Sequence, residues 1–144
     1  MSVFTEREQI IETVNKLFIY TDHRYWEKLQ NEVFSKFVHL DMTSMGGEVR
    51  ELLSNEICEN WSQGFQEIDV VNHLAGNYLV TIKENKAEVF AYATATHYKK
   101  NAKRGNTRDF VGSYDFNLVK NHEGWRIDKM KYNLRYALGN LQLK

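Results

Sequence analysis

Four long strand-like runs in the second half of the chain constrain the fold more than any other feature. They are separated by short polar connections and span Asp69–Ile82, Ala87–Tyr98, Phe110–Val119 and Trp125–Tyr136. Runs that follow one another in this way pair as an antiparallel sheet. Apolar residues in the first half of the chain recur mainly at helical spacing, so helices precede the sheet. This order predicts an α+β fold with the helices packed on one face.

Three helices are expected before the long strands. The first runs from about Glu6 to Tyr20, because a capping-box spacing precedes a run of apolar residues three and four apart. The second is short, from about Tyr25 to Val33, and the third carries Ile57, Trp61 and Phe65 at spacings of four. A curved antiparallel sheet that is covered on one side by three N-terminal helices leaves a pocket between the two layers, and this pocket is where we expect function.

A shorter hairpin is expected between the second and third helices. Phe37–Met45 alternates with the period of a strand, and Gly46-Gly47 marks a turn. Val49–Leu53 then returns as the hairpin partner. The 144 residues contain no linker or repeat, so we assign residues 1–144 to a single domain.

Composition excludes several classes of protein. The 19 basic and 19 acidic residues give a formal net charge of +0, which provides no general attraction for nucleic acid. The longest uncharged stretch, Val70–Ile82, is too short and too polar to span a bilayer. Cys58 is the only cysteine, so no intramolecular disulfide forms. We therefore expect a cytoplasmic protein with no membrane segment and no nucleic-acid partner.

Two histidines on neighbouring strands are the most informative pair. If the turn is Glu84-Asn85-Lys86, His73 and His97 are equally far from its centre and lie directly opposite each other on one face. Two such imidazoles repel when both are charged, so at least one pKa should fall and leave a neutral base near physiological pH. Alanines share this face of the second strand. They favour either a cavity floor or close packing of a helix.

Two further features have alternative interpretations. Asp22, just after the first expected helix, either caps the second helix or orients a histidine in the pocket. A basic cluster follows the His97 strand and contains Lys99, Lys100, Lys103, Arg104 and Arg108. Since no aromatic residues are interleaved with it, a solvated hairpin loop is favoured over a phosphate or RNA site.

Several short strings occur in a characteristic order along the chain. They are Tyr20-x-Asp22 with Trp26, the strand with His73 and Asn77, Ala95-x-His97-Tyr98, Gly112-x-Tyr114, Gly124-Trp125-Arg126-Ile127 and Gly139-Asn140. Together they resemble the SnoaL-like branch of the nuclear transport factor 2-like superfamily over nearly the whole chain. The resemblance implies a cone-shaped α+β fold with a deep pocket, often in a homodimer formed through the sheet.

Within that superfamily the chain is most similar to the scytalone dehydratase-like enzymes. The resemblance implies that Asp22, His73 and His97 are the catalytic set. One imidazole would act as the base on a carbon next to a carbonyl, and the Asp–His pair would manage the departing hydroxyl. Tyrosines hold a water on the carbonyl in those enzymes, but Met42 stands about where one of them is expected. Tyr20, Tyr92 and Tyr114 are the candidates to supply a hydroxyl instead.

The same resemblance implies the ligand and its contacts. The residues expected to contact a small hydrophobic cyclic substrate are Tyr20, Trp26, Met42, Asn77 and Tyr114. A polyketide fragment, a steroid-like ring and a small phenol suit such a pocket equally well.

Three functions follow as hypotheses. The first is a cofactor-independent dehydratase or isomerase without a metal. The second is a non-catalytic binding or scaffold subunit in which the histidines are structural. The third makes two histidines and one aspartate the ligands of a non-haem metal, which the metal-free character of the similar enzymes disfavours.

Overall fold

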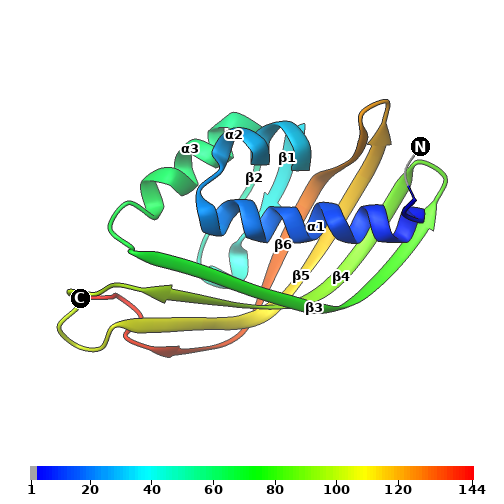
Figure 1. Cartoon of the computed structure of the whole chain (residues 1–144). Helices are drawn as coiled ribbons and strands as arrows, with labels where there is room; N and C mark the ends of the chain where they lie inside the picture. Colours follow the sequence, from blue (N-terminus) through cyan, green and yellow to red (C-terminus); the bar gives the residue numbers. More distant parts are fainter. Residues whose placement is uncertain (1–2) are drawn as a thin grey trace.

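The computed structural model describes residues 3–144, with the helices on one face of a single sheet (Figure 1). In chain order the elements are α1 (Glu6–His23), α2 (Trp26–Lys28), the π-helical turn η1 (Leu29–Val33), β1 (Phe34–Asp41), the 3₁₀ turn η2 (Thr43–Met45), β2 (Val49–Leu53), α3 (Ser54–Gly64), β3 (Val70–Lys83), β4 (Lys86–Tyr98), β5 (Thr107–Asn121) and β6 (Gly124–Gly139). This arrangement confirms the α+β cone.

The sheet is open and mixed. Its strand order is β2-β1-β6-β5-β4-β3, and the hairpin-connected neighbours are antiparallel as expected. The exception to the antiparallel prediction is the pairing of β1 with β6, which is parallel. No short turn joins these two strands, so a hairpin connection does not determine their relative direction.

Helix α1 is longer than the sequence pattern indicates. Thr5 caps its start by accepting a hydrogen bond from the Glu8 amide at 3.1 Å, and the helix continues beyond the expected end at Tyr20 to His23. Arg24 then ends it in the left-handed conformation, with φ of 61°. Asp22 therefore lies in the last turn of α1, and Tyr25 occupies the N-cap position of α2 that was one interpretation of Asp22. No helix within residues 3–144 has the length and apolar character needed to cross a bilayer.

The β3–β4 hairpin has a different register from the one expected. Lys83 pairs with Lys86 across a two-residue loop, rather than a three-residue one, and a bulge follows between Gly76 and Leu79. Each change shifts the register by one residue, so together they move it by two. His73 consequently pairs with Ala95 and lies diagonally from His97 rather than directly opposite it. The two histidines still share one face, because a shift of two residues preserves the side of the sheet.

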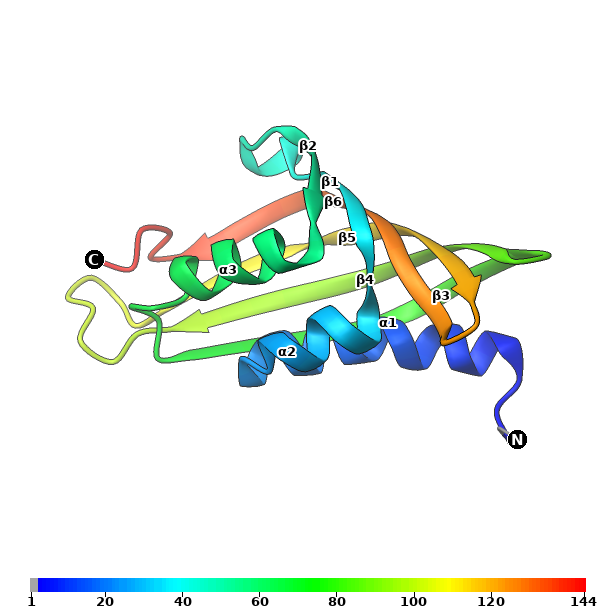
Figure 2. The ribbon, with the colours of Figure 1, turned by 90° about the horizontal axis from the view of Figure 1, so that it is seen from above.

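The main core lies between α1 and the sheet. From α1 it takes Ile10, Val14, Leu17 and Phe18, all nearly or fully buried, and from the strands it takes side chains that include Phe116, Leu118 and Ile127. Burying one such side chain contributes about 1.5–3 kcal/mol. Seen from above, α2 and α3 lie beside each other over the sheet (Figure 2). The alanines of β4 divide between both expected roles: Ala93 is in the core, and Ala95 borders the cavity described below.

Gly112 of β5 is required by a close approach between strands. A Cβ there would lie 2.7 Å from the Tyr132 hydroxyl and still closer to the Asn133 carbonyl oxygen. We expect Gly112→Ala to destabilise the protein by about 1–3 kcal/mol, because backbone and a buried ring must both move. The measurement is the free energy of unfolding in urea. Gly76→Ala is the matched strand control, since its Cβ would meet no atom within 4 Å. Equal stability of the two variants would contradict this prediction.

Candidate functional site

A cavity of about 340 Å³ lies between the helices and the face of the sheet that they cover. Its apolar wall includes Leu17, Phe18, Met42, Trp61, Phe65, Phe110 and Met130. Its polar groups come from five side chains on β3 to β6, namely His73, His97, Arg108, Tyr114 and Tyr132, and from Thr21 of α1. A mainly apolar cavity with a few convergent polar groups has the character of a small-molecule site.

Asp22 and His73 form a tight pair at one side of this cavity. The Asp22 Oδ1 atom lies 2.6 Å from the His73 Nδ1 atom, and Oδ2 accepts a hydrogen bond from the His73 backbone amide at 2.9 Å. Both side chains are largely buried, with exposed fractions of 13% and 10%. The carboxylate can only accept, so Nδ1 of His73 carries the proton and donates it. Asp22 therefore orients a histidine, which is the functional interpretation of this residue.

The other ring nitrogen of His73 is available for chemistry. Within residues 3–144, Nε2 of His73 has no hydrogen-bond partner, and the residue lines the cavity. The Phe18 ring, with its centroid 5.3 Å from that of the imidazole, holds the histidine from the side of α1. With Nδ1 protonated, the neutral ring presents an unprotonated Nε2 to the cavity, and Asp22 stabilises the imidazolium that forms when it takes a proton.

His97 has different surroundings. Its Nδ1 atom accepts a hydrogen bond from Nε of Arg108 at 2.9 Å, and the rings of Phe65 and Phe110 meet it edge-on at 5.5 and 5.6 Å. Burial, then the Arg108 charge, then the His73 charge lower the pKa of His97 from 6.5 to about 4. The expected fall in one histidine pKa is confirmed, but burial rather than repulsion between the imidazoles is its main cause.

The predicted binding residues separate into two groups. Met42 and Tyr114 line the cavity, and burial, with a smaller contribution from Tyr132, raises the pKa of Tyr114 above its ordinary value. Tyr114 is therefore a protonated donor at neutral pH. Within residues 3–144 its hydroxyl has no hydrogen-bond partner.

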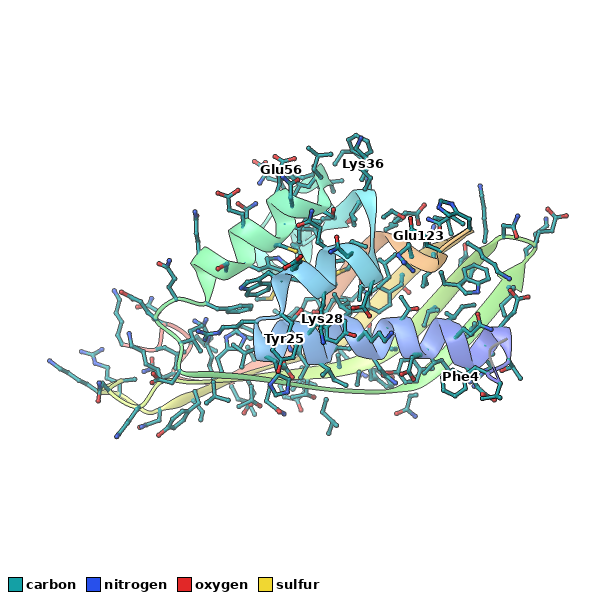
Figure 3. All side chains as sticks on the ribbon, turned by 45° about the horizontal axis from the view of Figure 1, so that its top comes forward. Phe4, Tyr25, Lys28, Lys36, Glu56 and Glu123 are labelled. Atoms are coloured by element: carbon teal, nitrogen blue, oxygen red, sulfur yellow. The ribbon has the colours of Figure 1, made fainter. Side chains whose placement is uncertain are left out.

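Tyr20, Trp26 and Asn77 lie outside the cavity, so these substrate-contact predictions do not match its walls. The Tyr20 hydroxyl bonds Glu32 at 3.0 Å. The Lys28 ammonium, whose side chain is labelled in Figure 3, lies 5.7 Å from the centroid of the Tyr20 ring. Trp26 stacks on Phe65, which is itself a wall residue. Asn77 is exposed at the bulge of β3, with φ of 58°.

Arg108 is the functional candidate that sequence reasoning missed. It was grouped with a solvated loop, but β5 begins at Thr107, and Arg108 pairs directly with His97 across the β4–β5 hairpin. The signal in the sequence was the separation of Arg108 from His97, which is that of a pair across the β4–β5 hairpin. Because β5 starts three residues before the expected Phe110, the last residue of the basic cluster lies opposite the buried His97.

Neither a metal centre nor a thiol nucleophile has support in the geometry. No group of three or more His, Cys, Asp or Glu side chains within residues 3–144 has the arrangement of a metal site. Cys58 is buried beneath α2, and burial raises its pKa to about 11. The thiol thus stays protonated and makes a poor nucleophile.

Residues 2–131 match the model of the SnoaL-like domain family. A comparison with curated protein sequences finds no match.

Solved structures share the fold at low sequence identity. The Kfla4162 protein of Kribbella flavida superimposes with a TM-score of 0.91 at 23% identity, covering 96% of this chain and 95% of that one. A candidate scytalone dehydratase of Novosphingobium aromaticivorans has a TM-score of 0.80 at 14% identity, covering 94% and 87%. A hexachlorocyclohexane dehydrochlorinase of Novosphingobium barchaimii has a TM-score of 0.75 at 10% identity, covering 92% and 88%.

The low pKa of His97 predicts an acid-sensitive fold. Because the folded-state pKa lies below the unfolded value of 6.5, unfolding takes up a proton in mild acid. The stability that neutral His97 contributes is complete above pH 6.5 and is lost as the pH falls towards about 4. Between pH 7 and pH 5 we expect the wild type to lose about 2 kcal/mol more than His97→Gln. Urea unfolding of both proteins measures this difference, and parallel pH profiles would refute it.

Proposed function

The chain belongs to the SnoaL-like domain family, and from the geometry of its cavity we propose that it is a cofactor-independent dehydratase or isomerase. Its substrate is a small cyclic or aromatic hydroxy-carbonyl compound. The observation that carries this proposal is the Asp22–His73 pair, whose Nε2 faces an apolar cavity. A base that is oriented and electrostatically supported in this way suits proton abstraction from carbon.

The proposed reaction begins with proton transfer. The His73 Nε2 atom takes a proton from the carbon next to the carbonyl, and the electrons of the C–H bond move to form an enolate. When the carbonyl re-forms, a carbon–carbon double bond forms and the C–O bond to the neighbouring hydroxyl breaks. The departing hydroxide takes the proton from His73 and leaves as water. Returning the proton to a different carbon of the enolate gives isomerisation instead.

Tyr114 and His97 suit the carbonyl side of this reaction. Both line the cavity, and the high pKa of Tyr114 keeps its hydroxyl protonated. Donors that face the oxygen as negative charge develops on it lower the barrier, because a water-poor site strengthens the interaction. The base function is thus proposed for His73 and a donor function for His97.

The cavity volume and the structural relatives support this class of substrate. A space of about 340 Å³ accommodates one or two small rings. The names of two relatives, scytalone dehydratase and hexachlorocyclohexane dehydrochlorinase, both denote elimination reactions. The alternative, a non-catalytic small-molecule-binding or scaffold subunit, predicts ligand binding without turnover.

A homodimer stays a prediction for this chain. The outer face of the sheet exposes apolar side chains, among them Leu74, Leu79, Tyr92 and Tyr136. A second copy of the chain, packed through this face, is the occupant that the family resemblance implies. Analytical ultracentrifugation at micromolar concentration checks it, and a strict monomer would remove it.

His73→Gln and Asp22→Asn should each lower the rate by about 10²–10⁴-fold, because the first removes the base and the second its orienting partner. The assay follows exchange of the proton next to the carbonyl into D₂O, and loss of water, for a panel of cyclic hydroxyketones. His39→Gln is the matched control. Its Nδ1 atom also pairs with a carboxylate at 2.6 Å, that of Glu51, but on the exposed β1–β2 hairpin. Ligand binding without exchange by the wild type would support the non-catalytic role instead.

A further inference from the structure

Arg108 lines the cavity beside His97 and is held there by three contacts. Its Nε atom donates to His97, and its Nη1 atom donates to the Leu141 carbonyl oxygen at 2.8 Å. The guanidinium also lies over the Phe110 ring, 5.4 Å from the centroid. These contacts with three different residues leave the Arg108 side chain little freedom.

The charge of Arg108 has no counter-ion among the described residues. Within residues 3–144 no carboxylate forms an ion pair with it. The adjacent Asp109 accepts a hydrogen bond from Thr96 instead. An unpaired cation that is partly buried beside a cavity attracts an anionic or strongly polar oxygen. The Arg108 side of the cavity is therefore electropositive, whereas Asp22 supplies negative charge behind His73.

The hydrogen bond from Arg108 also determines the proton position on His97. A guanidinium has only donors, so Nδ1 of His97 must accept and carries no proton. A neutral imidazole holds one proton, which is then on Nε2. Within residues 3–144 this Nε2 atom has no hydrogen-bond partner, and His97 lines the cavity. The two histidines thus present opposite chemistry to the ligand: His73 an acceptor and His97 a donor.

We propose that Arg108 is a positioning residue that locks His97 in its Nε2–H form, and that the His97–Arg108 pair selects ligands carrying a carbonyl, enolate or phenolate oxygen. The link from that oxygen to the substrate carbonyl rests on the proposed function, but the proton position does not. In this arrangement the ligand oxygen lies against His97 and the reacting C–H bond lies against His73. The pair therefore orients the ligand as well as binding it.

The proton positions are directly measurable in the unliganded protein. Long-range ¹H–¹⁵N correlation spectra of uniformly labelled wild type distinguish the two neutral imidazole forms. We expect His97 with its proton on Nε2 at pH 7, and His73 with its proton on Nδ1. A proton on Nδ1 of His97 would overturn the inference. A proton on Nε2 of His73 would instead overturn the proposed base and leave the His97 assignment standing.

Arg108→Met removes the donor while keeping an extended side chain. We expect its His97 to populate both neutral forms and its pKa to rise towards the ordinary value, since a neighbouring cation is lost. Arg135→Met is the matched control, because Arg135 contacts Tyr92, an exposed tyrosine, rather than the cavity. An unchanged His97 spectrum in Arg108→Met would contradict the positioning role. If this variant does not fold, the wild-type spectrum alone still decides the proton position.

The ligand preference is tested with two probes of similar shape. At about pH 8, 4-nitrophenol is largely a phenolate, and 4-nitroanisole is its neutral methyl ether. We expect the phenolate to bind wild type at least about tenfold more tightly than Arg108→Met, the size of a charge-assisted hydrogen bond, and the ether to bind both proteins alike. Equilibrium dialysis measures both. The ligand preference would be overturned if Arg108→Met lost equal affinity for both probes, or if the phenolate did not bind the wild type.

Discussion

The rest of the site depends on the contact between Asp22 and His73, which connects helix α1 to strand β3. One carboxylate accepts hydrogen bonds from both the ring and the backbone amide of His73, so the last turn of α1 is attached to β3 near the start of that strand. This attachment positions the Phe18 ring against the imidazole from the same helix. Removing a partner from such a buried pair leaves an unsatisfied group that costs about 1–3 kcal/mol or more. The placement of α1 and the orientation of the His73 ring therefore depend on the same contact.

The two histidines on adjacent strands differ in hydrogen-bonding role because the Nδ1 atom of each has a different partner. His73 faces a carboxylate through Nδ1, which leaves its other nitrogen free to accept. His97 faces a guanidinium through the same atom, which leaves its other nitrogen to donate. Burial strengthens the difference, because it disfavours the doubly protonated form of His97. The chemical role of each histidine thus follows from the residue that its Nδ1 atom contacts, and not from the residue type alone.

Local patterns in the sequence were sufficient for the order of the elements and for the face shared by the two histidines. Register was not predictable in this way, because the two-residue loop at Glu84-Asn85 and the bulge at Gly76 are small features whose shifts add. Arg108 was missed for a related reason, since strand ends depend on pairing with a neighbour rather than on the residue's own polarity. The parallel pairing of β1 with β6 comes from packing between segments far apart in the chain.

The bulge divides β3 into two halves that differ in whether their even-numbered or their odd-numbered residues face inward. Between the bulge and the loop, even-numbered residues of β3 such as Val80 face inward, whereas beyond the bulge odd-numbered residues such as Val71 do. If the hairpin loop gains or loses one residue, the resulting register shift can therefore be compensated at the bulge and does not reach His73. The tip can therefore vary in length while the half of the ribbon that carries His73 and His97 keeps the same side chains on the inner face. Loss of the bulge itself would turn the histidine to solvent without altering a single residue of the site.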